Sequence, residues 1–232
     1  MNSADNYLGL IPARGGSKGV EQKNIRIFAG EPLIGHTIRS ANEAQNIDRI
    51  IVTTDDEEIK SVAESYGAEV PFIRPSELAT DEAPTNLVID HALFHLETEE
   101  DYLPEAVVLL QPTSPLRTAE HIDGAIDAHL EKDVTTVISV YRDHSYRWQP
   151  DEPGATQLNY TGSSSRRQDK QPEYVENGAI YITETLKFRN TSKIRGGKIE
   201  LFEMTKRESI DIDTEFDFWL AETIKQRLEG EI

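Results

Sequence analysis

Short apolar runs alternate with helix-like segments over the first 140 residues of this chain. Strands are predicted at residues 7–11, 49–53, 70–73, 106–110 and 135–140. Between these runs, apolar side chains recur at helical spacing in residues 32–44, 55–66, 83–99 and 119–130. Such an alternation is typical of βαβ units, whose right-handed crossovers place helices on both faces of a sheet. The predicted fold class is therefore α/β, with a Rossmann-like, mostly parallel sheet flanked by helices.

The alternation breaks after Val140. Residues 141–175 are rich in proline, glycine, serine and charged side chains, so we interpret them as a small excursion from the sheet. By itself, this segment fits either a disordered linker or an arm that contacts a second subunit. Strands are predicted again at residues 177–183 and 199–204, and a closing helix at residues 215–228. We expect one domain over residues 1–232 that includes the excursion.

The chain is strongly acidic, with 42 Asp and Glu against 24 Lys and Arg and a net charge of −18. Nonspecific nucleic-acid binding requires a basic face, so we expect no nucleic-acid partner. No apolar run approaches the roughly 20 residues of a membrane span, and residues 1–7 lack the pattern of an export signal. We therefore expect no membrane partner and a cytoplasmic location. The lack of cysteine excludes disulfides and thiolate metal sites.

A glycine-rich, cationic loop follows the first predicted strand. Its three glycines allow close approach of a ligand, and its backbone N–H groups can form an anion-binding nest. The loop and the residues just after it carry three cations, at Arg14, Lys18 and Lys23. The spacing matches neither a P-loop nor the dinucleotide-binding Gly-x-Gly-x-x-Gly pattern. Three cations so close together in an acidic chain favour a phosphate site, and the alternative is an ordinary flexible loop.

Two carboxylates lie near the C-terminus, at Asp211 and Asp213. In an extended segment, alternate side chains share a face, so both carboxylates would point the same way. Their mutual repulsion is relieved by a cation, and Mg²⁺ commonly takes one or two carboxylates together with substrate phosphates. We expect an Mg²⁺ site here. The alternative is that Asp213 caps the closing helix while Asp211 lies on the surface.

Two further polar segments stand out. Residues 111–117 follow a predicted strand and contain two prolines, which make the loop rigid enough either to orient a substrate or to serve as a structural turn. Residues 163–168 contain Arg166 and Arg167, which suit a carboxylate ligand or a solvated loop. The four loops at residues 12–24, 53–56, 74–85 and 111–118 all follow strands. They should converge at the carboxyl edge of the sheet, where such folds bind ligands.

Four motifs in order resemble the acylneuraminate cytidylyltransferases (CMP-sialic acid synthetases). They are Ile-Pro-Ala-Arg-Gly-Gly-Ser-Lys-Gly at 11–19 with Lys23 and Asn24, Leu-Gln-Pro-Thr-Ser-Pro-Leu-Arg at 110–117, Asn-Gly-Ala-Ile-Tyr at 177–181, and Ile-Asp-Ile-Asp-Thr at 210–214. The similarity extends from Leu8 to about Glu222. Glu21 stands where the family often has proline. Because an acid is unexpected next to a triphosphate site, we expect the Glu21 side chain to point to solvent.

The resemblance implies roles for individual residues. Arg14 and Lys23 would hold the triphosphate with Gly15, Gly16, Ser17 and Lys18, and Asn24, Arg74 and Thr85 would face the base and ribose. The sugar would meet Gln111, Arg167, Asn177 and Tyr181, with Arg167 near its carboxylate. Mg²⁺ would bind Asp211 and Asp213. The residues implied in catalysis are Arg14, Lys23, Gln111 and Asp211.

The resemblance also implies a reaction and an assembly. CTP and an acidic nine-carbon sugar would give a CMP-sugar and pyrophosphate, in a homodimer whose 141–175 excursion reaches the partner subunit. Two alternatives stay open at this point. The chain could activate another sugar acid (legionaminic, pseudaminic or Kdo-type) or use another nucleotide, or it could be a catalytically silent module that binds nucleotide sugars.

Overall fold

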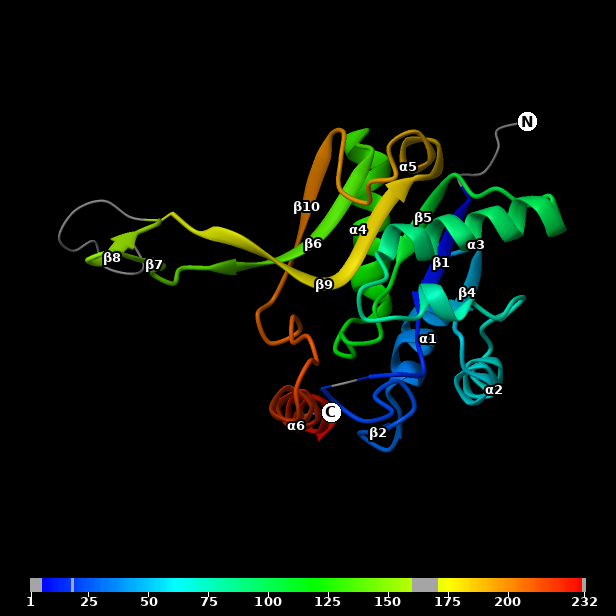
Figure 1. Cartoon of the computed structure of the whole chain (residues 1–232), viewed down its shortest axis with the longest axis horizontal. Helices are drawn as coiled ribbons and strands as arrows, with labels where there is room; N and C mark the ends of the chain where they lie inside the picture. Colours follow the sequence, from blue (N-terminus) through cyan, green and yellow to red (C-terminus); the bar gives the residue numbers. More distant parts are fainter. Residues whose placement is uncertain (1–5, 18, 160–170, 231–232) are drawn as a thin grey trace.

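The computed structural model describes residues 6–17, 19–159 and 171–230, and its centre is a six-stranded sheet in the order β10-β6-β9-β5-β1-β4 (Figure 1). Its strands are β1 (Tyr7–Pro12), β4 (Arg49–Thr53), β5 (Ala106–Leu109), β6 (Thr136–Asp143), β9 (Glu173–Glu184) and β10 (Ile199–Met204). β1 pairs in parallel with β4 and β5, and β10 pairs in parallel with β6. β9 runs antiparallel between β5 and β6. The predicted α/β class with a mostly parallel sheet is confirmed.

Helices cover both faces of this sheet. On one face, α1 (Leu33–Glu43), α2 (Glu57–Ser65) and α4 (Ala119–Lys132) contribute to one buried apolar cluster. On the other face, α3 (Thr85–Glu100) and α5 (Thr185–Thr191) contribute to a second cluster. β1 serves both, since Leu8 and Leu10 join the second cluster while Tyr7 and Ile11 join the first. This alternation is the two-residue period of a strand buried on both faces.

A third apolar cluster lies beyond the carboxyl edge of the sheet. The last helix, α6 (Glu215–Gly230), buries Phe218 and Ala221 there against Phe28 and Leu116. Phe28 belongs to a short hairpin of β2 (Ile27–Phe28) and β3 (Glu31–Pro32). Figure 1 shows α6 beside this hairpin, so the end of the described chain packs next to the segment that follows the glycine-rich loop. Ile212 is buried in the same cluster and anchors the segment before α6.

One predicted strand is wrong. Residues 70–73 form no regular strand, and only isolated parallel bridges join Glu69 to Ile51 and Ile73 to Thr54. Pro71 lies between these bridges and has no backbone N–H to donate to a ladder. Three further elements were not predicted from the sequence: α5, the hairpin of β2 and β3, and the 3₁₀ turn η1 (Ser76–Leu78).

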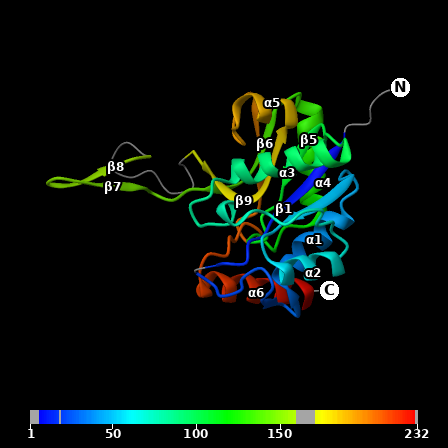
Figure 2. The same ribbon diagram turned by 45° about the vertical axis from the view of Figure 1, so that its right-hand side comes forward.

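The excursion is an arm in the residues that the structure describes. β6 and β9 continue their pairing outward as far as Asp143 and Glu173, and a hairpin of β7 (Trp148–Asp151) and β8 (Gly154–Gln157) follows. Both ribbon views show this arm projecting away from the sheet (Figures 1 and 2). Residues 160–170, which include Arg166 and Arg167, lie outside the described residues. None of the helices formed by the described residues combines the length and hydropathy needed to span a bilayer.

Candidate active site

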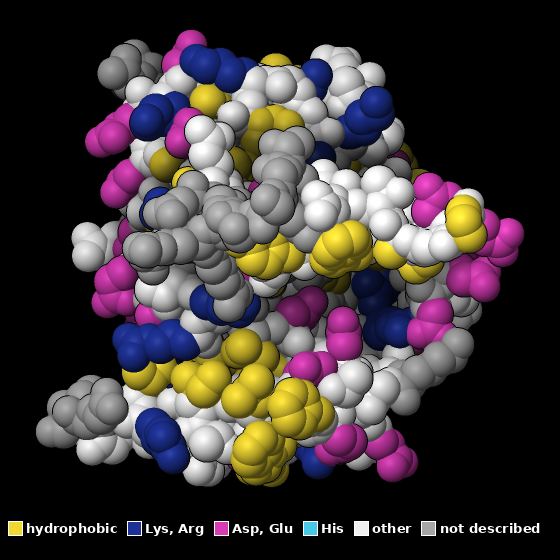
Figure 3. All heavy atoms as spheres, turned by 90° about the vertical axis from the view of Figure 1, so that its left-hand side faces the viewer, with side chains coloured by type: hydrophobic (Ala, Val, Ile, Leu, Met, Phe, Trp, Pro, Cys, Tyr) yellow, Lys and Arg dark blue, Asp and Glu magenta, His cyan; other side chains and the backbone are white. Residues whose placement is uncertain are grey.

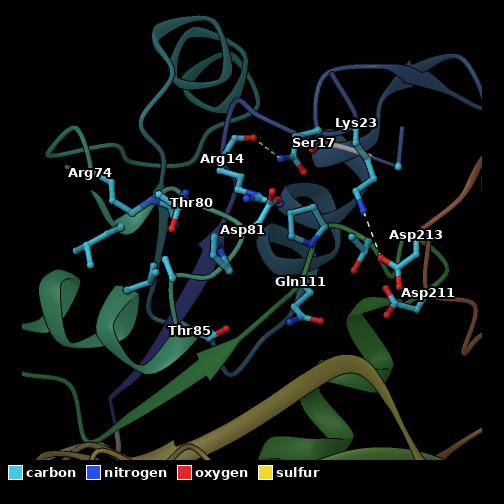
Figure 4. A pocket seen from close by; sticks show the side chains of 18 residues that line it. Arg14, Ser17, Lys23, Arg74, Thr80, Asp81, Thr85, Gln111, Asp211 and Asp213 are labelled. Atoms are coloured by element: carbon cyan, nitrogen blue, oxygen red, sulfur yellow. Dashed lines mark hydrogen bonds and ion pairs between the residues drawn. The ribbon is translucent and has the colours of Figure 1, made fainter. Parts of the chain in front are cut away.

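A cavity of about 430 Å³ lies at the carboxyl ends of β1 and β5. It brings together nine of the residues singled out in the sequence, namely Arg14, Ser17, Lys23, Asn24, Arg74, Thr85, Gln111, Asp211 and Asp213 (Figure 4). They come from loops that are far apart in the chain, and the carboxyl edge of the parallel strands gathers them. Thr80, Asp81 and Thr113 also line the cavity; they lie in the predicted loops 74–85 and 111–118, and no individual role was predicted for them.

The glycine-rich loop is fixed against the end of β4. The Gly15 N–H donates to Asp55 Oδ1 at 3.0 Å, and a Cβ on Gly15 would lie 2.6 Å from Asp56 Oδ2. Asn24 Nδ2 donates to the Arg14 carbonyl at 2.9 Å and closes the loop from within. Gly15 therefore shapes the loop, neither Gly15 nor Gly16 lines the cavity wall, and Lys18 lies outside the described residues. Glu21 is exposed and is not part of the cavity wall.

Arg14 faces an acid across the cavity. Its guanidinium donates to the carboxylate of Asp81 and, at 3.5 Å, to the carbonyl of Ala79 (Figure 4). Both residues belong to the loop between η1 and α3. An anionic ligand would therefore compete with Asp81 for Arg14, because each can offer oxygen acceptors to the same guanidinium.

Lys23 joins the glycine-rich loop to the carboxylate segment. Its Nζ donates to the Ile212 carbonyl at 2.6 Å and lies 3.7 Å from Asp213 Oδ1. The Ile212 N–H donates to the Thr113 carbonyl at 2.9 Å, and the Ile212 side chain is buried. Asp211 and Asp213 on either side of it consequently both face the cavity, as the alternation had predicted.

The capping alternative for Asp213 does not describe this helix start. Thr214 and Asp217 exchange hydrogen bonds at the beginning of α6, with Thr214 N–H and Oγ1 both donating to Asp217 Oδ2 at 2.9 and 2.7 Å. The Asp217 N–H donates back to Thr214 Oγ1 at 3.3 Å. This reciprocal cap satisfies the first turn, and the carboxylate of Asp213 stays available at the cavity.

The carboxylate pair suits a hard cation. Burial raises the pKa of Asp211, and the negative charges of Asp213 and Asp217 raise it further, against a hydrogen bond from Thr113 and the charge of Lys23. A divalent cation would offset this repulsion. Among the described residues, no three or more His, Cys, Asp or Glu side chains are grouped to hold a metal. The pair thus fits Mg²⁺, which usually completes its shell with water and substrate phosphates.

Arg74 lies on the opposite side of the cavity near the start of α3. Its N–H donates to the Thr54 carbonyl at 2.7 Å, and its guanidinium lies 3.8 Å from Asp55. The side chain is 4% exposed, and burial lowers its pKa despite the nearby carboxylate of Asp55. Thr85 begins α3, so the partial positive charge of a helix N-terminus adds to that of Arg74.

The proline-containing loop is held by a buried arginine. Arg117 Nη1 donates to the carbonyls of Gln111 and Ala179 at 3.2 and 2.8 Å, and burial lowers the pKa of Arg117 to about 9. Gln111 lines the cavity, whereas Arg117 lies beneath it. Each of the two interpretations of this segment therefore applies to a different residue. Gln111 is placed to orient a ligand, and Arg117 makes the loop a rigid turn.

A second cavity of about 320 Å³ adjoins the first and shares Thr85 and Gln111 with it. Tyr181 lines this second cavity, and its hydroxyl donates to Glu176 Oε2 at 3.1 Å. Burial raises the pKa of Tyr181, and the charge of Glu176 adds to that effect. Lys193 and Arg195 also line this cavity and were not predicted as site residues from the sequence. Their spacing of two residues in an acidic chain was the available signal.

Asn177 lies in the wall of neither cavity. It is 3% exposed, accepts a hydrogen bond from Ser139 Oγ at 2.6 Å and donates to Ser209 Oγ at 2.9 Å. Its contacts therefore join β6 and β9 to the segment that leads to Asp211. Of the residues expected at the sugar, the structure brings Gln111 and Tyr181 together. Arg167 lies outside the described residues.

The family model and the similar sequences found among known proteins point to the same family. The family model described as "Cytidylyltransferase" matches residues 8–228. An N-acylneuraminate cytidylyltransferase from Escherichia coli O18:K1:H7 is 39% identical over 228 residues, which is 95% of this chain and 52% of that protein. A CMP-N,N'-diacetyllegionaminic acid synthase from Legionella pneumophila is 35% identical, covering 94% of this chain and 96% of that one.

Two further findings concern how much of each relative the chain covers and which solved structures share its fold. The chain spans about half the length of the matched cytidylyltransferases from Escherichia coli and Oncorhynchus mykiss, at 52% and 49%. Among solved structures, a CMP:2-keto-3-deoxy-manno-octonic acid synthetase complexed with CTP matches with a TM-score of 0.70 at 14% identity. That match covers 98% of this chain and 100% of the other. At this identity the likeness shows a shared fold.

Proposed function

This chain belongs to the cytidylyltransferase family, and from that premise we propose that it transfers CMP from CTP to an acidic nine-carbon sugar of the sialic acid type, with release of pyrophosphate. The observation that carries the proposal is the meeting of Lys23 with the Asp211 and Asp213 segment in one cavity. A site that must hold a triphosphate with a divalent cation needs both signs of charge side by side. In a chain of net charge −18, such a local cluster of cations is distinctive.

The nucleotide would occupy the larger cavity. Its triphosphate would lie along the glycine-rich loop, with Arg14 leaving Asp81 for phosphate oxygens and Lys23 contacting the same chain of phosphates. Base and ribose would lie toward Arg74 and Thr85, at the start of α3. Asn24, which holds the Arg14 carbonyl, would fix the loop that carries these contacts.

We propose Mg²⁺ as the cofactor, held by Asp211 and Asp213. When bound, Mg²⁺ would neutralise phosphate charge and lower the pKa of a hydroxyl in contact with it. The Ile212 backbone, bonded to both Thr113 and Lys23, keeps the two carboxylates facing the cavity. The relief of repulsion at Asp211 supports the assignment.

The acceptor sugar would occupy the smaller cavity, with its reactive hydroxyl near Gln111 at the junction of the two. The anomeric hydroxyl oxygen attacks the α-phosphorus of CTP. The bond between that phosphorus and the oxygen that bridges it to the β-phosphorus breaks, and pyrophosphate leaves. The hydroxyl proton passes to solvent. The Gln111 amide is too weak a base to take this proton, so its role is to orient the acceptor. Cations at Arg14 and Lys23 stabilise the charge that grows on the leaving oxygens.

We also propose that the protein is a homodimer in which the arm contacts the partner subunit. The arm exposes large apolar side chains at Trp148, Leu158 and Tyr174. Figure 3 shows hydrophobic side chains gathered on the face from which the arm projects. Sedimentation equilibrium tests this: the wild type should sediment at twice the monomer mass, and Trp148→Asp with Leu158→Asp should give a monomer. Leu130→Asp, at an exposed position on α4, is the control and should stay dimeric. A monomeric wild type would contradict the proposal.

The cytoplasm is the proposed location, since cells hold CTP there. Several sugar acids are candidates for the acceptor, because relatives with similar percentages of identical residues carry the names of different sugar acids.

A pyrophosphate-release assay tests the proposed reaction. Each of the four nucleoside triphosphates is paired with N-acetylneuraminic acid, N,N'-diacetyllegionaminic acid, pseudaminic acid and 2-keto-3-deoxy-manno-octonic acid, with Mg²⁺ and with EDTA. We expect release with CTP and at least one acid, only when Mg²⁺ is present. Release with no pair would overturn the reaction and favour a silent module that binds nucleotide sugars. Equal release with EDTA would overturn the Mg²⁺ assignment.

A further inference from the structure

The loop after α5 forms one wall of the smaller cavity. Ser192, Lys193, Ile194 and Arg195 line it together with Thr85 and Asn86, and Gln111 is shared with the larger cavity. This loop carries two cations into a cavity that has no acidic residue in its described wall. What the loop does there rests on the proposed function, because it concerns the acceptor that this cavity would take.

The loop is held at both ends. Ser192 adopts a left-handed φ of +51°, and its N–H donates to the Phe188 carbonyl at 2.6 Å, which ends α5. Ile194 packs against the apolar cluster formed with α3 and α5. With Ile194 facing inward, Lys193 and Arg195 on either side of it are exposed. The two cations are therefore presented to the cavity by a fixed turn.

The two cations differ in whether they already form an ion pair with a carboxylate. Arg195 makes a two-pronged contact with Glu176, from Nε to Oε1 and Oε2 at 3.0 and 2.8 Å and from Nη2 to Oε2 at 2.6 Å. Its guanidinium also lies 5.1 Å from the ring centre of Tyr181. Most of its charge is offset by Glu176. Among the described residues, Lys193 has no carboxylate within ion-pair distance.

We infer that Lys193 binds the carboxylate of the acceptor sugar and is a specificity-determining residue for acidic sugars. Among the described residues that line this cavity, Lys193 is the cation that remains for an anionic ligand, because it has no carboxylate partner and Arg195 is neutralised by Glu176. A charge-assisted hydrogen bond from Nζ would attract the acid and set its distance from Gln111. Arg195, fixed by Glu176 and Tyr181, forms the floor against which the rest of the sugar lies.

Lys193→Gln tests this inference in the pyrophosphate-release assay, with saturating CTP and Mg²⁺ and whichever of the four acids the wild type uses. The KM for the acid should rise by about 10- to 100-fold, the usual effect of losing a hydrogen bond to a charged group. The KM for CTP should stay within about twofold, and Lys193→Arg should restore most of the loss. Lys60→Gln, at a half-buried position on α2 outside both cavities, is the matched control.

A second readout separates binding of the carboxylate from a structural effect. The KM for the acid is compared with the inhibition constant of its methyl ester, measured as a competitor of the acid. The wild type should prefer the acid, and Lys193→Gln should bring the two constants together. An unchanged preference, or an unchanged KM for the acid, would overturn the inference while leaving the proposed reaction intact. A wild type that is inactive with every acid would instead overturn the proposed function.

Discussion

Gly19 and Asp213 are in backbone contact: a Cβ built on Gly19 would lie 2.0 Å from the Asp213 carbonyl oxygen. The phosphate-side loop after β1 and the carboxylate segment before α6 are thus packed directly on each other, although almost 200 residues of chain separate them. Lys23 reinforces this contact by donating to the Ile212 carbonyl next to it. The placement of the two charged halves of the cavity depends on glycine at this position.

Gly19→Ala should therefore destabilise the protein, because the added methyl group has to push one backbone segment away from the other. We expect a loss of about 1–3 kcal/mol in the free energy of unfolding, as for other overpacked sites. Gly16→Ala is the matched control in the same loop, since no atom of the described residues beyond Gly16 itself and its two chain neighbours lies within 4 Å of the added Cβ. It should change stability by no more than about 0.5 kcal/mol. Urea unfolding measures both, and equal effects would contradict the close contact.

Asn177→Ala should act on stability more than on the acceptor directly. The substitution removes the amide that pairs with Ser139 and Ser209 and leaves buried groups without partners. We expect a loss of about 1–3 kcal/mol in the free energy of unfolding. Asn42→Ala, at an exposed position where the amide donates to the Tyr66 carbonyl, should cost less. Thermal or urea unfolding checks this. A large rise in the KM for the acceptor with unchanged stability would instead place Asn177 in contact with the sugar.

Asp143, at the base of the arm, should make stability depend on pH. Hydrogen bonds from Ser145, and to a smaller extent the charges of Lys206 and Arg147, lower the pKa of Asp143 below its ordinary 3.8. The stabilisation is therefore present above pH 3.8 and is lost as the pH falls through the lower folded pKa. Asp143→Asn should reduce the free energy of unfolding by about 1 kcal/mol at pH 7.

This difference between Asp143→Asn and the wild type should shrink as the pH falls below 3.8, because the wild-type side chain then also becomes neutral. Asp101→Asn is the control, at an exposed left-handed position that ends α3 and that asparagine tolerates. It should follow the wild-type curve. Urea unfolding from pH 3 to pH 7 measures all three proteins, and a constant difference for Asp143→Asn would rule out titration of this carboxyl as the cause.

The sheet could be predicted from the sequence because its information is local. The apolar run that contains Leu8 and Leu10 has no polar interruption, as a strand buried on both faces requires. Pro71 marks where this reasoning fails, since the apolar residues around it suggest a strand while its missing N–H prevents a ladder. α5 is only seven residues long, so its two large apolar residues, Leu186 and Phe188, give no clear helical period.

The larger cavity was also largely predictable, because its loops all follow strands and the carboxyl edge of the sheet gathers them. The smaller cavity was not. Lys193 and Arg195 reach it through a turn after a helix that the sequence did not reveal, and Arg195 depends on its contact with Glu176 on β9. Asn177 shows the converse: its place in a motif suggested a ligand contact, whereas the fold buries it between strands. Such assignments depend on tertiary packing, which periodicity does not encode.

The most direct test of the account is pyrophosphate release by Asp211→Asn with CTP, the accepted sugar acid and Mg²⁺. The substitution keeps the size of the side chain but removes one of the two charges proposed to hold the metal. We expect turnover to fall by about 100-fold or more, since a metal ion contributes several kcal/mol to such a step. The unfolding midpoint should stay close to that of the wild type, because Asp211 faces an open cavity. Near-wild-type turnover by a folded Asp211→Asn would contradict the assignment of this cavity as the site of reaction.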